Sequence, residues 1–141
     1  MAMTMYSPHK CMDLTAGGFL NLRKRIAEML PKDLADYYAL FCDYRHEFTP
    51  KDKEEYAREL NRLANLPENR KYEHTLNFLY ATDIAARMPH EVARDLIELI
   101  GDYDDDVIYG YAGRGVCAAK FADFKEILQD AYKTKKGFWW R

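Results

Sequence analysis

A cysteine and a histidine four residues apart are the first side chains in this chain whose spacing could support chemistry. On a helix, Cys42 and His46 would lie side by side, and a thiol beside an imidazole can bind a metal ion or act as a nucleophile with its base. Two ligands do not make a zinc site, and no second pair has a matching spacing. We therefore interpret Cys42 as a buried thiol beside a surface histidine, and we predict no catalytic residue, no metal and no cofactor.

Alternating aspartates form the second candidate. Asp102, Asp104 and Asp106 are spaced like the first carboxylates of a calcium-binding loop. Such a loop needs glycine at its sixth position and glutamate at its twelfth, where this chain has Val107 and Gly113. We interpret the segment as a helix-capping loop with spare negative charge, and the alternatives are an acidic patch that faces a partner or a weak Mg²⁺ site.

Negative charge extends beyond this loop. Over residues 91–106, seven acidic residues accompany one arginine, which gives a net charge of −6. Such density increases self-repulsion, and nearby tyrosines combine a ring that buries well with a polar tip. We predict a surface here that binds a basic protein or mimics nucleic acid, formed by Asp102, Tyr103, Asp104, Asp105, Asp106, Tyr109 and Tyr111.

The C-terminal residues have the opposite character, because they are basic and aromatic. Residues 114–141 carry a net charge of +4, and the run 135–141 could stack on nucleic-acid bases or lie at a membrane interface. The run has no sustained amphipathic stretch, so we expect no membrane binding. Because exposed tryptophans are costly in water, we expect Phe138, Trp139 and Trp140 to dock on the body of the protein or on a partner, and we count them as partner-binding candidates.

Two further groups have simpler interpretations. The stretch Gly110-x-x-Gly113-x-Gly115 reverses the order of a dinucleotide fingerprint, so we expect a flexible connection. Arg23-Lys24-Arg25 is a basic triplet whose members point different ways on a helix, so we expect it to lie on a solvated face.

Apolar residues at steps of three and four place most of these side chains on helices. The strongest local signal is Thr49-Pro50-Lys51-Asp52, which predicts an N-cap, a proline at the first helical position and a carboxylate at the third. The spacing predicts helices over about 15–30, 32–48, 50–64, 70–88, 90–100, 107–111 and 116–133.

These elements predict an all-α protein, an irregular single-domain bundle of about six to seven short antiparallel helices. We expect an irregular N-terminal segment over 1–14, a helical domain over 15–133 and a basic-aromatic tail over 134–141. The segment 96–111, with its apolar helix end, Gly-Asp turn and aspartates before Val107, resembles one turn of a HEAT-type helical repeat, which implies helical hairpins.

Length, charge and cysteine content restrict the classes of function that fit this chain. A chain of 141 residues with net charge −2 is one domain without overall basic character, and three widely spaced cysteines without a signal peptide suggest reduced thiols in the cytoplasm. We expect a cytoplasmic, non-enzymatic protein-binding module, an inhibitor or immunity-type antagonist that masks the surface of a partner protein. The alternatives are a nucleic-acid-binding regulator that uses the basic C-terminal tail and a helical-bundle enzyme whose site the sequence does not reveal.

Overall fold

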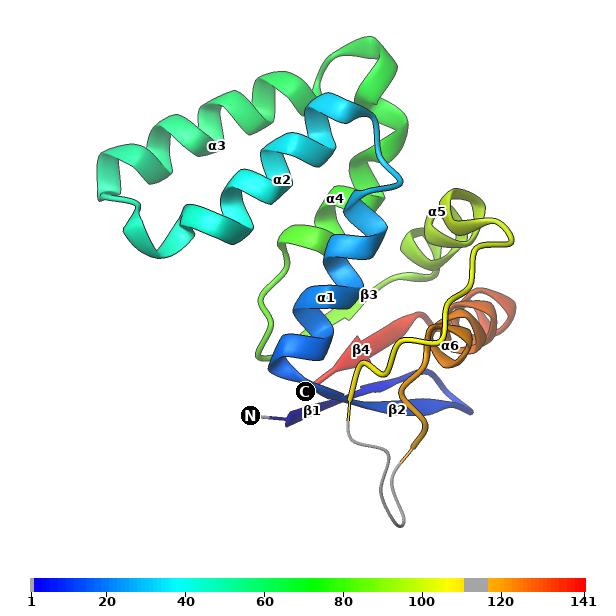
Figure 1. Ribbon diagram of the computed structural model, residues 1–141. Helices are drawn as coiled ribbons and strands as arrows, with labels where there is room; N and C mark the ends of the chain where they lie inside the picture. The colour runs from blue at the N-terminus through cyan, green and yellow to red at the C-terminus, as the bar shows by residue number, and fades with distance from the viewer. Residues whose placement is uncertain (1, 111–116) are drawn as a thin grey trace.

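A computed structural model describes residues 2–110 and 117–141, and it shows a fold that mixes helices with a sheet (Figure 1). This part of the chain forms six α-helices and a four-stranded antiparallel sheet of order β2-β1-β4-β3. The prediction of an all-α helical bundle is therefore wrong. The elements are β1 (Ala2–Tyr6), β2 (Cys11–Thr15), α1 (Ala16–Ala27), α2 (Lys32–Tyr44), α3 (Pro50–Ala64), α4 (Glu73–Tyr80), β3 (Ala86–Met88), α5 (His90–Ile100), α6 (Phe121–Thr134) and β4 (Phe138–Trp140), with short 3₁₀ helices over Arg45–Glu47 and Pro67–Tyr72.

The N-terminal segment, which we expected to be irregular, is a β-hairpin. Strand β1 pairs antiparallel with β2, with Met5 opposite Met12, and the Ser7 N–H donates to the carbonyl of Lys10 at 2.9 Å to close the turn. Side chains alternate along both strands, because Met5 and Met12 are buried while their neighbours lie on the other face. The hairpin thus gives the sheet one apolar face and one polar face.

The C-terminal tail is also part of the sheet. Strand β4 lies between β1 and β3, with Trp139 opposite Tyr6 on one side and opposite Arg87 on the other. Phe138 and Trp140 are fully buried and pack with Phe78 in the core. The labelled helices lie on one side of the sheet (Figure 1). Phe138 and Trp140 face this side, because they contact rings of α1 and α4.

Two predicted helices have a different structure, and a third, expected over 116–133, begins only at Phe121. The helix expected over 70–88 ends at Tyr80, and Ala86–Met88 forms β3 instead. The segment after α5 is extended rather than helical, since Tyr109 donates its N–H to the carbonyl of Ala119 at 2.8 Å and accepts from Thr15 at 3.2 Å. These bonds fix 107–110 at the edge of β2, so the HEAT-like hairpin expected over 96–111 is not formed by the described residues.

The sequence signal for the start of one helix predicted the structure correctly. Thr49 and Asp52 form the expected capping box, in which each side chain accepts the other's backbone N–H, at 3.1 and 3.0 Å. The helix that begins there, α3, pairs with α2 in a hairpin that extends away from the sheet (Figure 1). In the described part of the chain, no helix combines the length and the apolarity needed to cross a membrane.

Candidate functional site

The acidic loop that follows α5 is built around one of its own aspartates. The carboxylate of Asp105 accepts hydrogen bonds from the hydroxyls of Tyr103 at 2.8 Å and Tyr109 at 2.7 Å, and from the N–H of Val107 at 3.0 Å. Burial alone would raise the pKa of Asp105, but these hydrogen bonds outweigh it and hold that pKa below its usual value. Asp105 therefore acts as an internal anchor of the loop.

These hydrogen bonds determine which residues of the predicted acidic surface are exposed to solvent. Tyr109 is buried and Tyr103 is half-buried, whereas Asp102, Asp104 and Asp106 are exposed. Tyr111 lies outside the described residues.

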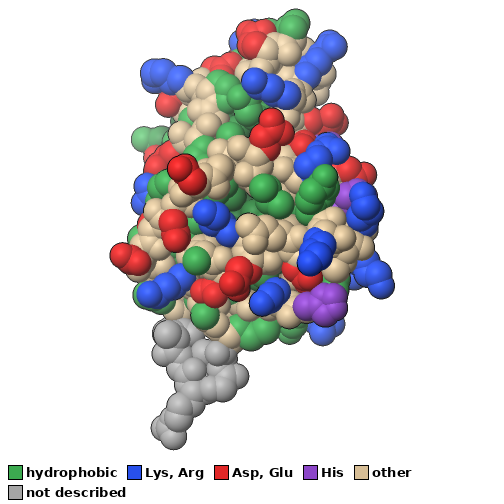
Figure 2. All heavy atoms as spheres, turned by 90° about the vertical axis from the view of Figure 1, so that its right-hand side faces the viewer, with side chains coloured by type: hydrophobic (Ala, Val, Ile, Leu, Met, Phe, Trp, Pro, Cys, Tyr) green, Lys and Arg blue, Asp and Glu red, His purple; other side chains and the backbone are tan. Residues whose placement is uncertain are grey.

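Basic side chains dilute the negative charge of this loop. Lys125 donates to the carbonyl of Tyr103 at 3.0 Å, and the Nε of Arg25 lies 3.9 Å from the carboxylate of Asp105. On the side of the molecule that carries α5 and α6, acidic and basic side chains are interspersed (Figure 2). The loop therefore offers three exposed carboxylates in a mixed surface, which is a weaker electrostatic feature than the sequence suggested.

The face of the sheet that is turned away from the helices carries a more distinctive arrangement than the acidic loop. No described helix lies on this face (Figure 1). Three side chains from the neighbouring strands β3, β4 and β1, and a fourth from the residue after β4, follow one another across it. The guanidinium of Arg87 lies 4.5 Å from the ring centre of Trp139, Trp139 stacks on Tyr6 at 6.0 Å, and Arg141 lies 5.4 Å from the ring centre of Tyr6. We call these four residues the arginine–aromatic row.

Within this row, the Trp139 indole has a neighbouring side chain from each adjacent strand. Strand β4 lies between β1 and β3, so Tyr6 approaches from one side and Arg87 from the other. The rings of Tyr6 and Trp139 are nearly parallel, at 19°. Trp139 is half-buried, and the flanking Arg87 and Arg141 are exposed.

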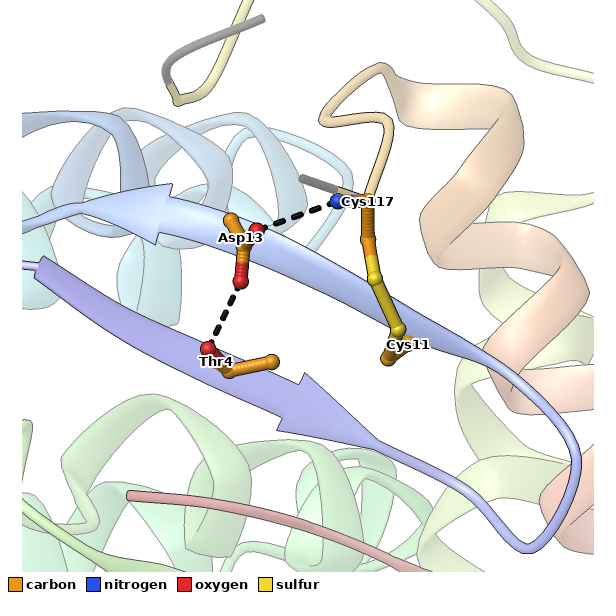
Figure 3. The surroundings of a disulfide bond; sticks show 4 residues. All are labelled: Thr4, Cys11, Asp13 and Cys117. Carbon is orange, nitrogen blue, oxygen red and sulfur yellow. Dashed lines mark hydrogen bonds between the residues drawn. A yellow bond between two sulfur atoms is a disulfide. The ribbon is translucent and has the colours of Figure 1, made fainter. Parts of the chain in front are cut away.

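The β2 side of this face is closed by a disulfide and a short polar network (Figure 3). Cys11 on β2 is bonded to Cys117, and Asp13 accepts from the hydroxyl of Thr4 at 2.7 Å and from the N–H of Cys117 at 3.0 Å. These bonds tie the start of the segment before α6 to the hairpin. The open part of the face is thus the part built from β1, β4 and β3.

The thiol–imidazole pair considered in the sequence has a geometry that does not favour catalysis. Cys42 lies in α2, outside the disulfide, and burial raises the pKa of its thiol, so little of the nucleophilic thiolate form is present at neutral pH. His46 is exposed in the 3₁₀ turn that follows α2. Among residues 2–110 and 117–141, no three His, Cys, Asp or Glu side chains gather in a way that could hold a metal ion.

Arg23 is buried, so the prediction that it lies on a solvated face is wrong. Its side chain lies inside the helical layer at 5% exposure, and its guanidinium is 4.1 Å from the ring centre of Phe19, 5.4 Å from that of Trp140 and 5.5 Å from that of Phe78. Each such contact contributes about 0.5–2 kcal/mol, whereas burying an ion costs several kcal/mol. Burial accordingly lowers the pKa of Arg23 to about 10.

Two members of the arginine–aromatic row were not indicated by the sequence. The alternation of Met3, Thr4, Met5 and Tyr6 is a period-two pattern that could have placed Tyr6 on a sheet face. Arg87 had no comparable signal, because a strand of three residues is too short for a periodicity. No family model, curated protein or solved structure matches this chain.

Proposed function

We propose that this protein is a non-enzymatic binding protein, an inhibitor or immunity-type antagonist that covers a partner protein with the open face of its sheet. The observation that carries the proposal is the arginine–aromatic row on that face. Tryptophan, tyrosine and arginine are the side chains most often found at the energetic centre of protein interfaces. Paired strands already fix the four side chains in a row, so little conformational freedom is lost on binding.

The row also suggests the chemistry of the partner. Its rings are flanked by Arg87 and Arg141, and neither arginine forms an ion pair with an acidic side chain of the described residues. Guanidinium groups bind carboxylates with two parallel hydrogen bonds. A partner surface with an apolar centre and carboxylates on either side would satisfy both parts of the row.

A nucleic-acid-binding regulator is the second candidate, since β4 is aromatic and is flanked by Lys135, Lys136 and Arg141. Proteins that bind single strands without sequence preference stack bases on free ring faces. The guanidinium of Arg87 lies 4.5 Å from the ring centre of Trp139, so a base could stack on that face only after Arg87 had moved away. The row therefore favours a protein partner over a nucleic acid.

Two matched variants test the proposal by affinity capture from the cells in which the protein occurs. The row variant combines Arg87→Gln with Trp139→Thr, and the loop variant changes Asp102, Asp104 and Asp106 to asparagine but keeps the anchor Asp105. We expect a partner protein to be captured by the wild type and by the loop variant, and its recovery to fall by about tenfold or more with the row variant.

Each other outcome has a definite meaning. Loss of capture with the loop variant alone would move the site to the acidic loop and indicate a basic partner. Equal capture by all three proteins would exclude both surfaces. Binding of a single-stranded oligonucleotide that weakens steeply with salt and requires Trp139 would support the nucleic-acid regulator instead.

The proposal also concerns the cellular compartment in which the protein occurs. The cytoplasmic expectation depended on reduced cysteines and on the lack of a signal-peptide pattern. The bond between Cys11 and Cys117 removes the first support, because such bonds persist mainly in oxidising compartments. Thiol labelling of the protein from its native source distinguishes an oxidising compartment from a reducing cytoplasm. Labelling of Cys42 alone indicates the disulfide form, and labelling of all three cysteines indicates a reducing cytoplasm.

A further inference from the structure

Arg23 is a buried charge that the arginine–aromatic row does not use. Two nitrogens of its guanidinium, Nε and Nη2, are closed to solvent and have no hydrogen-bond partner among the described residues, so a ligand would reach this charge through the remaining nitrogen, Nη1. No acidic side chain in the described part of the chain lies within ion-pair distance of it. Aromatic rings offset part of the cost of this burial, but they do not neutralise the charge.

A cavity of about 320 Å³ adjoins this arginine, between α1, α2 and the segment that follows α4. This volume is at the lower end of the range for small-molecule sites, roughly 300–1,000 Å³. Its walls are mainly apolar and aromatic. The lining includes Phe19, Leu20, Arg23, Tyr38, Phe41 and Arg45.

The charged lining residues define which ligand fits. Arg23 and Arg45 are the two cations of the lining, and Asp83 is its one acid, so the described lining has a net charge of +1. Asp83 is exposed and is not paired with either arginine in the described structure. A single negative charge on the ligand would balance this lining, whereas a dianion such as phosphate would exceed it and meet the carboxylate of Asp83.

We propose that this cavity binds a small monocarboxylate with an apolar body, whose carboxylate pairs with Arg23 and Arg45 and whose body packs against Phe19, Tyr38 and Phe41. The site lies within the helical layer, on the other side of the sheet from the arginine–aromatic row. It is therefore independent of the proposed partner-binding face.

The test uses sodium benzoate as the probe, and benzyl alcohol and inorganic phosphate as controls. Benzyl alcohol has a similar body without the charge, and phosphate has charge without an apolar body. In a Trp139→Phe background, Trp140 is the remaining tryptophan, and the guanidinium of Arg23 lies 5.4 Å from its ring centre. Benzoate should therefore change the tryptophan fluorescence in a saturable way, and titration calorimetry on the wild type should give the same affinity.

Variants assign the binding to the proposed groups. Arg23→Met should weaken benzoate binding by about tenfold or more, because it removes the buried cation while keeping an unbranched apolar stem. Asp83→Asn should strengthen binding by about twofold to fivefold, because it removes a competing charge at an exposed position. Arg25→Met, a change of charge on the same helix but outside the cavity lining, should leave the affinity within about twofold.

The outcomes are decisive in both directions. If Arg23→Met does not fold, Arg45→Gln provides the second test and should weaken binding severalfold. The proposal is overturned if benzoate does not bind, if benzyl alcohol binds as well as benzoate, or if a folded Arg23→Met protein keeps the wild-type affinity. Tighter binding of phosphate than of benzoate would also contradict it, because the cavity would then select charge over the apolar body.

Discussion

Asp105 connects the loop after α5 to the core through two tyrosine hydroxyls and a backbone N–H. We expect Asp105→Asn to lower the free energy of unfolding by about 1–2 kcal/mol at pH 7, because hydrogen bonds to a charged acceptor become hydrogen bonds to a neutral one. Urea denaturation measures this change. Asp102→Asn is the matched control, since Asp102 is exposed in the same loop, and it should change the free energy by less than about 0.5 kcal/mol.

The lowered pKa of Asp105 gives the same variant a defined pH dependence. A carboxylate with a lower pKa in the folded state than its unfolded value of about 3.9 contributes its full stabilisation above that value. The stabilisation is lost as the pH falls through the folded-state pKa. The difference in the free energy of unfolding between wild type and Asp105→Asn should therefore keep its full size from pH 5 to 7 and should shrink below about pH 4. A difference that grows on acidification would contradict this role.

At the scale of elements, the disulfide joins the N-terminal hairpin to the segment before α6. Cys11 and Cys117 are separated by 106 positions, so the bond restricts a large loop in the unfolded chain. Reduction should lower the free energy of unfolding by about 2–4 kcal/mol. Urea denaturation with and without dithiothreitol measures the effect.

Two cysteine variants separate this effect from other consequences of reduction. Cys42→Ser should show the same sensitivity to dithiothreitol as the wild type, because Cys42 is outside the disulfide. Cys11→Ser should be less stable than the wild type and should not respond to the reductant. Equal stability of oxidised and reduced Cys42→Ser would show that the bond contributes nothing.

Two adjacent glycines at the start of α1 report on how closely this helix meets the extended loop. A Cβ at Gly18 would lie 1.5 Å from the carbonyl oxygen of Tyr109, whereas a Cβ at Gly17 would meet nothing within 4 Å. Gly18→Ala should lower the free energy of unfolding by about 1–3 kcal/mol, because the loop must move. Gly17→Ala should raise it by up to about 1 kcal/mol, because alanine favours the helix. Thermal denaturation of the pair checks both signs, and equal effects would disprove the close approach.

The elements that the sequence revealed are those that depend on local interactions. Pro31, the Thr49 capping box and the amphipathic spacing of α5 and α6 all act within one helix, and each marked a real boundary or face. The hairpin at 2–15 also had a local signal, the alternation of Met3 and Met5 with polar neighbours, which has a period of two and does not appear in a helical spacing of three and four.

The remaining elements could not be found in this way because distant partners create them. Strands β3 and β4 have three residues each, and their hydrogen bonds join positions about fifty residues apart, such as Arg87 and Trp139. The candidate site depends on this pairing. Trp139 was singled out for its type, but its neighbours Tyr6 and Arg87 come from strands at other points of the chain. The identity of a site residue was therefore visible in the sequence, and its surroundings were not.

At the scale of the whole molecule, the fold is closed by its last strand. The chain begins in β1 and ends in β4, and these two strands pair at the centre of the sheet, so β3 is attached to the hairpin only through β4. Phe138 and Trp140 place two large side chains in the core that the helices share. Phe138 and Trp140, which the sequence predicted to bind a partner, are therefore structural, and Trp139 is the one of the three that remains a candidate for binding.

Removing residues 137–141 should unfold the domain rather than trim a tail. Loss of a buried aromatic side chain costs about 3–5 kcal/mol, and loss of two approaches the whole stability of a small domain, about 5–15 kcal/mol. The truncated chain should lose its cooperative thermal transition and bind an apolar dye such as ANS. The double variant Lys135→Gln and Lys136→Gln removes positive charge next to the strand but keeps the strand, so it should unfold like the wild type. Cooperative unfolding of the truncated chain would mean that the hairpin and helices form a core without β4, and the arginine–aromatic row would then be an appendage instead of part of the fold.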